Sequence, residues 1–428
     1  MPTRDDIYKN MMEEVLHYVW KHKILPLKDL KTTDGKPVEV LNPGMLNHDA
    51  GPDFIGAKVK IDGLLWAGNV EIHLRTSDWY RHGHDYNPAY DSIILHVASQ
   101  VDAPLNYPSG ENVPQIEIEV PNYILANYEQ LIHADTYPPC KEILVNLPNI
   151  KIHNWLTALQ VERLEMRTCQ IMERRERLDK SWEDTLFVTI ARSFGFGKNG
   201  DAFEMWANNI PTNALSKHRD NLFQIKAFFF GQAGMLDNKG IPNIMEAEYN
   251  RLCKEYAYLK TKFSLTPIER STWQYLRLRP QNFPHVRILQ LAHLYYDDSF
   301  AFSKVLNAET EEDFHKLFDT QSGDFNLSKA SRASLLINCV APLIFAYGTY
   351  RNDESLRERA IHLLEALPAE DNRIVRDWAD AGVVAEHSAD TQALIHLCKQ
   401  YCEKHECIRC RFGHEYLRHT PDWLREEE

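Results

Sequence analysis

The sequence predicts an α+β domain over residues 1–136, followed by a large all-helical domain over residues 137–428. In the N-terminal part, short segments alternate apolar and polar side chains with the two-residue period of β-strands. From Tyr123 onward, apolar side chains recur at the spacing of helices, and a helix expected over 123–133 fits either domain. We place the boundary at Tyr137-Pro-Pro-Cys140, because its prolines interrupt the helical pattern.

Length and composition are those of an ordinary globular protein. The chain has 428 residues, of which 44% are hydrophobic and 25% are charged, so it can bury a core without disulfides or metals. A net charge of −13 argues against a surface coated with nucleic-acid-binding charge, although it leaves room for a local basic groove. No apolar run approaches the roughly 18–20 residues of a membrane span, and the start lacks a secretory signal. We therefore expect a cytoplasmic protein that does not bind membranes; its oligomeric state is open.

The N-terminal domain is expected to begin with a helix and to continue as a sheet. Apolar side chains at helical spacing predict a helix over 5–22, which Pro26 ends. Asp62-Gly63 is a strong signal for a two-residue hairpin turn, and a short helical region is expected after Ser77. Strands are expected at 38–41, 54–61, 64–74, 92–97 and 115–120.

Three local patterns describe the helical domain. Residues 151–180 predict one long helix, on which Arg174-Arg-Glu-Arg177 is interpreted as a solvated face. Ser181-Trp-Glu-Asp184 predicts a capping box at the start of the next helix. Gly195-Phe-Gly-Lys-Asn-Gly200 fits a dinucleotide-binding pattern but follows a helix instead of a strand, so we interpret it as a helix–helix turn.

Polar side chains gather on two neighbouring strands of the predicted sheet. Asp53 begins the first strand of the hairpin, and Glu71 and His73 lie two residues apart on the second, so they leave the same face. Polar groups on a largely apolar strand are costly unless something uses them. Two carboxylates and a backbone carbonyl suit Mg²⁺, which polarises a phosphodiester and lowers the pKa of the attacking water.

Pro52-Asp53 and Glu71-Ile72-His73 resemble the pattern of the PD-(D/E)XK nuclease superfamily. That pattern places Pro-Asp on one strand and Asp/Glu-X-Lys on the next, within an αβββαβ core of restriction-endonuclease type. The resemblance implies Mg²⁺ or Mn²⁺ held by Asp53, Glu71 and the Ile72 carbonyl. It also implies that His73 takes the role of the lysine.

The same resemblance implies a metal-dependent phosphodiesterase, a nuclease that acts on nucleic acid, with the helical domain binding or selecting the substrate. Members often add an acidic residue from the first helix, for which Glu13 and Glu14 are both candidates. The alternative is a catalytically inactive, nuclease-like binding or scaffold protein. The acidic balance and the missing lysine favour this alternative.

The predicted site requires an irregular hairpin. A regular two-residue turn pairs Phe54 with Glu71, which sends Asp53 to the opposite face of the sheet. A bulge at Gly56 or Gly68, or a break in pairing before Phe54, provides the one-residue slip that the site needs. We therefore predict such a bulge or break.

Two further groups of metal-ligating side chains are present. His82-Gly-His84 suits Zn, Ni or Fe, but the turn-forming residues around it favour a solvated turn, and His96 is interpreted as a core histidine. Near the C-terminus, four thiolates could hold Zn²⁺ or an iron–sulfur cluster, or could be reduced cysteines on a terminal helix. Those four residues are Cys398, Cys402, Cys407 and Cys410.

Five motifs link the chain to a second family: Leu16-His-Tyr-Val-Trp20, Gly51-Pro-Asp-Phe54, Gly68-Asn-Val-Glu-Ile-His73, Tyr90-Asp-Ser-Ile-Ile-Leu-His96 and Cys407-Ile-Arg-Cys410. In these motifs the chain resembles an uncharacterised bacterial family, a domain of unknown function. The resemblance covers most of the chain and implies no established activity.

Overall fold

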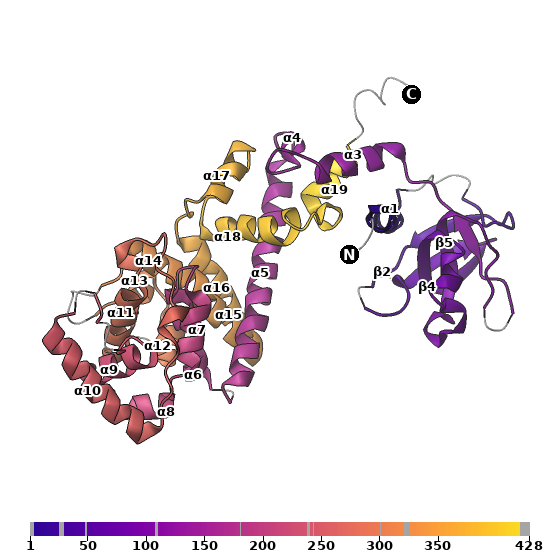
Figure 1. The fold of residues 1–428 in the computed structure, drawn as a ribbon. Helices are drawn as coiled ribbons and strands as arrows, with labels where there is room; N and C mark the ends of the chain where they lie inside the picture. The colour runs from indigo at the N-terminus through magenta and orange to yellow at the C-terminus, as the bar shows by residue number, and fades with distance from the viewer. Residues whose placement is uncertain are drawn as a thin grey trace. The chain divides into compact units, whose positions relative to one another are not determined.

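The computed structural model describes residues 4–24, 30–47, 49–107, 110–179, 181–237, 240–242, 244–299, 301–320 and 326–419. The chain forms two compact units (Figure 1). Unit 1 comprises Met1–Leu147 together with Lys399–Glu428, and unit 2 comprises Pro148–Cys398. The boundary predicted at 136/137 therefore falls inside unit 1. The C-terminal segment, which the sequence pattern assigned to the helical domain, belongs to unit 1 because it packs on helices of that unit.

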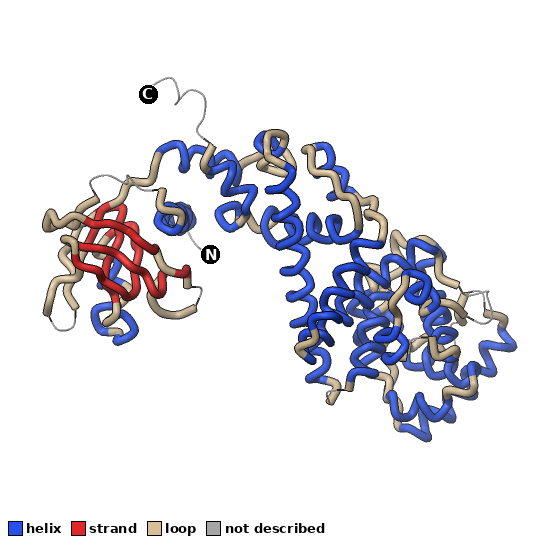
Figure 2. The backbone as a smooth tube through the Cα atoms, turned by 180° about the vertical axis from the view of Figure 1, so that it is seen from behind, coloured by secondary structure: helices blue, strands red, loops and turns tan. Residues whose placement is uncertain are grey.

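Unit 1 is built on a mixed six-stranded sheet (Figure 2). The strand order is β1-β3-β4-β5-β6, with β2 paired to β3; β1, β3 and β4 run antiparallel, whereas β4, β5 and β6 run parallel. Helices α1 (Arg4–Lys21) and α2 (Asp78–Arg81) both contact β4. The strands are β1 (Val38–Asn42), β2 (Met45–Leu46), β3 (Phe54–Ile61), β4 (Leu64–Arg75), β5 (Ile93–Gln100) and β6 (Gln115–Glu117).

A bulge shifts the register of the β3–β4 hairpin by one residue. Ile61 pairs with Leu64 across the turn, but at the far end Phe54 pairs with Val70 instead of Glu71. Gly56 lies in the shifted stretch with a φ of 71°, a conformation that favours glycine, and its N–H donates to Asn69 Oδ1. The predicted slip near Gly56 is confirmed.

Short helices and the C-terminal segment complete unit 1. Helix α19 contacts both α3 and α4. The Asn127 side-chain amide on α3 donates to the backbone carbonyls of Tyr416, Leu417 and His419. These bonds fasten the end of α19, whose carbonyls lack helical partners, to the rest of unit 1. The elements are η1 (His84–Tyr86), η2 (Pro88–Tyr90), α3 (Asn122–Ile132), α4 (Lys141–Leu144), η8 (Cys407–Arg409) and α19 (Arg411–Leu417).

Unit 2 is largely helical, as the sequence predicts. Ser181 caps α6 and its hydroxyl accepts from the Asp184 N–H, which confirms the Ser181 half of the predicted capping box. Gly195 follows the end of α6 and Gly200 begins α7, and the turn between them is tight because a Cβ on Gly195 would fall 2.3 Å from the Gly200 nitrogen. The main helices are α5 (Asn149–Arg177), α6 (Trp182–Phe194), α7 (Gly200–Asn208), α8 (Thr212–Leu215), α9 (Leu222–Gln232), α10 (Glu246–Phe263), α11 (Pro284–Tyr296), α12 (Phe302–Asn307), α13 (Glu311–Lys316), α14 (Lys329–Leu335), α15 (Ala341–Arg351), α16 (Glu354–Ala366), α17 (Arg373–Asp380) and α18 (Ser388–Leu397).

One described stretch of unit 2, Lys329–Arg351, is long and apolar enough to cross a membrane by length and composition alone. It runs through α14, a π-helical turn over Leu336–Val340 and α15. Because 67% of its most apolar window is buried inside the protein, it has the character of a core helix. A cytoplasmic location stays a prediction.

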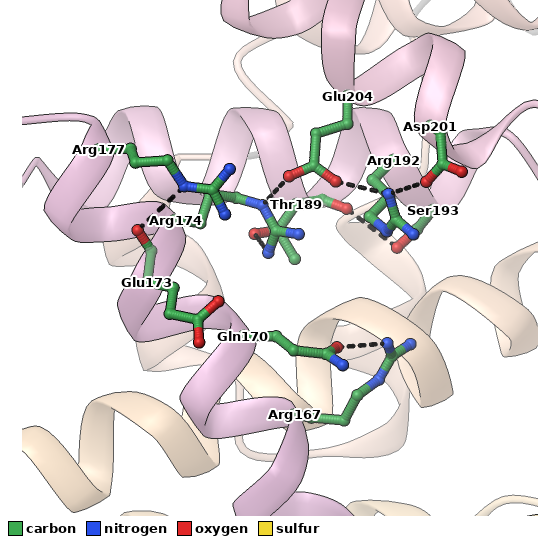
Figure 3. A network of polar contacts seen from close by, with 10 residues as sticks. All are labelled: Arg167, Gln170, Glu173, Arg174, Arg177, Thr189, Arg192, Ser193, Asp201 and Glu204. Carbon is green, nitrogen blue, oxygen red and sulfur yellow. Dashed lines mark hydrogen bonds and ion pairs between the residues drawn. The ribbon is translucent and has the colours of Figure 1, made fainter. Parts of the chain in front are cut away.

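Arginines and carboxylates form a polar network on α5, α6 and α7 (Figure 3). Arg174 Nε donates to Glu204 Oε1 at 2.9 Å, and Arg192 Nη1 donates to Glu204 Oε2 at 2.6 Å. Arg174 is 7% exposed, and the buried Arg175 guanidinium lies over the rings of Trp182 and Tyr350. The interpretation as a solvated face is wrong for these two arginines, because their partners come from other helices.

Candidate metal centre

The bulge brings Asp53 and Glu71 together. The Asp53 backbone N–H donates to Glu71 Oε2 at 3.1 Å, and the Ile72 N–H donates to Asp53 Oδ2 at 2.9 Å. Each carboxylate is therefore fixed by a backbone N–H of the other strand. Ile72 reaches this pair through its N–H; the role of its carbonyl as a metal ligand stays a prediction.

His73 follows on the same face of β4 and contacts two other imidazoles. Its Nδ1 lies 2.9 Å from His96 Nε2 on β5, and its Nε2 lies 3.2 Å from His82 Nδ1. Glu71 and His73 are 4% and 2% exposed, and His96 is fully buried. When His73 Nδ1 carries the proton and donates it to His96, the lone pair of Nε2 is directed at His82 and Glu71.

Three imidazole nitrogens converge at this point, and Glu71 Oε1 lies beside two of them. His73 Nε2 lies 3.6 Å from Glu71 Oε1, and His84 Nε2 lies 3.3 Å from the same oxygen. The ligand atoms of His73, His82 and His84 all lie within 4.8 Å of one another. In a tetrahedral zinc site with bonds of about 2.0–2.1 Å, ligand atoms are about 3.3 Å apart. Three pairs of atoms come close to that spacing: His73 Nε2 with His82 Nδ1 at 3.2 Å, and Glu71 Oε1 with His84 Nε2 and His73 Nε2 at 3.3 and 3.6 Å.

The loop after β4 directs His82 and His84 into the site. His82 ends α2, and Gly83, with a φ of 72°, turns the chain so that His84 begins η1. The His84 ring stacks on Tyr90 with centroids 3.9 Å apart and meets the edge of the buried Trp79. The segment is a turn, as its composition predicts, but the interpretation that it is solvated is wrong for His84, whose side chain is 11% exposed.

Burial sets the protonation of the cluster. It lowers the pKa of His73 to about 2 and that of His96 to about 3, with neighbouring histidines adding to the effect. The pKa values of His82 and His84 are also lowered, mainly by burial. Neutral imidazole is the form that binds a metal. Burial, and then the Asp53 charge, raise the pKa of Glu71 well above its usual range, so a cation there would replace a proton.

Helix α1 supplies a histidine that sequence reasoning missed. His17 Nε2 lies 3.3 Å from Asp53 Oδ2, and its ring packs edge-on against Phe54. Burial acts to lower the pKa of His17, but the nearby Asp53, Glu13 and Glu71 outweigh it and raise that pKa. The sequence did contain one signal for His17: it lies one helical turn after Glu13, and therefore on the same face of the predicted helix.

Glu13 and Glu14, the two acidic candidates on α1, have different neighbours. Burial, and the charges of Asp53 and Asp78, raise the pKa of Glu13 against the opposing effect of His17, which places Glu13 in the field of the site. Glu14 is exposed and accepts a hydrogen bond from Tyr128. Of the two, Glu13 is therefore the residue that can act on Asp53.

The C-terminal cysteines are divided between the two units. Cys398 ends unit 2, whereas Cys402, Cys407 and Cys410 lie in unit 1. All eight cysteines of the chain lie among the described residues, and no disulfide joins any of them. Metal binding by the C-terminal set stays a prediction.

One family model matches the chain, over residues 13–373, and is described as a protein of unknown function, DUF2851. The chain belongs to this family. The DUF2851 match includes every residue of the histidine cluster and stops before the C-terminal cysteines. No curated protein matches the DUF2851 chain. No solved structure matches it either.

Proposed function

We propose that unit 1 is a metal-dependent phosphodiesterase that hydrolyses nucleic acid. The observation that carries the proposal is the convergence of the His73, His82 and His84 ligand atoms within 4.8 Å of one another, with Glu71 Oε1 at 3.6 Å from His73 Nε2 and 3.3 Å from His84 Nε2. Three imidazoles and one carboxylate favour Zn²⁺, Ni²⁺ or Fe²⁺ over the Mg²⁺ or Mn²⁺ that two carboxylates would favour. A metal bound there supplies Lewis acidity and lowers the pKa of a water molecule.

Asp53 lies next to Glu71 but is not one of the proposed metal ligands. Its Oδ2 accepts from the Ile72 N–H and pairs with His17 Nε2. The His17–Asp53 pair is therefore positioned to take the proton of an attacking water, with Glu13 adding negative charge behind it. This arrangement gives Asp53 and His17 a role in proton transfer and Glu71 a role in metal binding.

The substrate class is supported by a cavity of about 690 Å³ in unit 1 that His17 helps to line. Three full cations, Lys21, Lys404 and Arg409, line the same cavity against the carboxylates of Glu14 and Glu406. An excess of cations beside the site suits a phosphate backbone, even though the whole chain carries a charge of −13.

The topology of unit 1 also supports the proposal. A helix, three antiparallel strands, a short helix and a parallel strand follow one another as α1, β1, β3, β4, α2 and β5. That is the order of an αβββαβ core of restriction-endonuclease type, which we propose for this unit.

The second candidate function is a nuclease-like binding or scaffold protein without catalysis. It is favoured by the neutral His73, whose low pKa prevents it from supplying the positive charge of the lysine that it replaces. In that case the histidine cluster binds metal for structural reasons alone.

The test is metal-dependent cleavage by the full-length protein. Protein stripped with a chelator is reloaded with Zn²⁺, Ni²⁺, Fe²⁺, Mn²⁺ or Mg²⁺, and cleavage of single- and double-stranded DNA and of RNA is measured. The double variant His82→Ala/His84→Ala is expected to lose both metal and cleavage. Asp53→Asn is expected to keep the metal and to lose about 100-fold or more in rate.

The control is His362→Ala, because His362 lies on unit 2 with a side chain that is 73% exposed. This variant should behave as the wild type. Metal binding by the wild type, with cleavage no faster than that of Asp53→Asn, would contradict the phosphodiesterase and support the scaffold.

A further inference from the structure

One cysteine from the middle of the chain and three from its C-terminal segment belong to one region of unit 1. Cys140 directly precedes α4, Cys407 begins η8, and Cys410 joins η8 to α19. Helix α19 contacts both η8 and α4, and η8 contacts α3. Cys402 lies five residues before Cys407, at the end of the π-helical turn Cys398–Cys402. The fold therefore brings Cys140 to the C-terminal cysteine segment.

The Cys407–Cys410 turn is tight and closely covered. The Cys410 N–H donates to the Cys407 carbonyl at 3.2 Å, which closes a single turn around the two intervening residues. The first turn of α19 packs directly on it, because a Cβ on Gly413 would fall only 2.0 Å from the Cys407 carbonyl oxygen. A two-residue turn between cysteines is a common way to present two thiolates to one metal.

The thiols of these residues share one buried environment. Cys140, Cys407 and Cys410 are 6%, 8% and 6% exposed, and Cys402 is half-buried. Burial, followed by the thiols of Cys410, Cys402 and Cys407, raises the pKa of the Cys140 thiol well above its usual range.

We propose that unit 1 contains a thiolate metal site, for Zn²⁺ or an iron–sulfur cluster, with four ligands: Cys140, Cys402, Cys407 and Cys410. The set takes Cys140 in place of Cys398, which belongs to unit 2. Binding of Zn²⁺ converts four thiols to thiolates and releases four protons to solvent, so no oxidant or reductant is required. A preformed iron–sulfur cluster would be transferred to the same four thiolates.

This site is separate from the histidine cluster and does not depend on the proposed phosphodiesterase. It joins residue 140 to residues 402–410, and so closes a loop that contains all of unit 2. It also holds the segment from which Lys404 and Arg409 reach the cavity beside His17. We expect its metal to stabilise unit 1 and to order that segment.

The experiment is elemental analysis of full-length protein purified without oxygen from medium supplied with both zinc and iron. About one Zn²⁺ per chain without colour identifies a zinc site, whereas iron with equimolar sulfide and visible absorption identifies a cluster. The measurement is made in the His82→Ala/His84→Ala background, so that metal at the histidine cluster is not counted.

In that background, Cys140→Ser is expected to lose the metal. Cys169→Ser is the matched control, since Cys169 is exposed and lies in unit 2, and should retain it. Cys398→Ser should also retain it. Loss of metal in Cys398→Ser with retention in Cys140→Ser, or absence of metal in every preparation, overturns the proposal.

A second measurement applies if Cys140→Ser does not fold. Co²⁺ is added to stripped protein of the same background, and thiolate-to-cobalt charge-transfer absorption is recorded, because its intensity grows with the number of thiolates bound. An intensity that corresponds to four thiolates supports the site, and absorption without thiolate bands contradicts it.

Discussion

His73 Nδ1 lies 2.9 Å from His96 Nε2, in the interior of the sheet. This contact selects which nitrogen of His73 is available to the cluster formed with Glu71, His82 and His84. The partner of a metal-binding histidine fixes both the orientation and the tautomer of its ring. His96 therefore acts on the candidate metal centre without belonging to the donor set.

Replacing His96 with phenylalanine is expected to weaken metal binding by about 10–100-fold, because His73 loses the acceptor that orients it. The measurement is competition for Zn²⁺ between the protein and a chromophoric chelator. His362→Ala serves as the control. An unchanged affinity in His96→Phe would show that His73 is oriented by other contacts.

Glu71 predicts how the stability of the metal-free protein depends on pH. Burial and the Asp53 charge raise its pKa from 4.5 to about 9. Between these values the folded state holds a proton that the unfolded state has released, so stability falls as pH rises toward 9, by at most about 1.4 kcal/mol per unit. The pKa values of His73, His82, His84 and His96 are lowered, so these histidines are neutral in both states above about pH 7 and do not contribute there. The raised pKa of His17 acts in the same direction as that of Glu71, which makes the Glu71→Gln comparison necessary.

We expect the melting temperature of the chelator-treated protein to fall between pH 7 and 9. Glu71→Gln should flatten this dependence, since the amide mimics the protonated carboxyl. Calorimetry of the two proteins across this range is the measurement. Equal slopes in both proteins would assign the pH dependence to another group.

Gly56 tests the bulge. Gly56→Ala is expected to lower the free energy of unfolding by about 1 kcal/mol, because a φ of 71° is strained for a residue with a side chain. The added Cβ itself would meet no atom within 4 Å, so the loss reflects the backbone conformation and not a clash. Gly63→Ala is the matched control, because Gly63 has a φ of 79° in the hairpin turn and equally open surroundings. Only Gly56→Ala should also slow cleavage, because the bulge places Asp53 beside Glu71. Equal effects of the two variants on cleavage would disconnect the bulge from the site.

The arginine network of unit 2 predicts different effects for two arginines that lie three residues apart on α5. Arg174→Met should lower the free energy of unfolding by about 1.5–3 kcal/mol, because it removes a buried, charged hydrogen bond to Glu204. Arg177→Met, at an exposed position on the same helix, should change it by less than about 0.5 kcal/mol. Urea denaturation of both variants checks the prediction, which fails if the two losses are equal.

The alternation of apolar and polar residues was sufficient to predict the strands and the two site residues that lie on β4. The two-residue period places Glu71 and His73 on one face, and turn geometry alone required the slip that Gly56 provides. The remainder depends on contacts that periodicity does not encode. His17 reaches Asp53 only because α1 packs on β4.

The same limit applies to the loop histidine and to the cysteines. His84 points inward because Tyr90 and Trp79 offer its ring an aromatic wall. Cys140 and Cys410 come to the same region only because α19 packs on α3 and α4, and no spacing rule relates residues so distant in the chain.

The return of Lys399–Glu428 to unit 1 makes unit 2 an insertion within a discontinuous domain. A ribosome therefore releases all of the inserted helices before residues 399–419 can dock, so the inserted part is able to fold while its host is still incomplete. Deleting these residues would remove the elements that pack on α1, α3 and α4. The loss of stability should therefore appear in the N-terminal part of the protein.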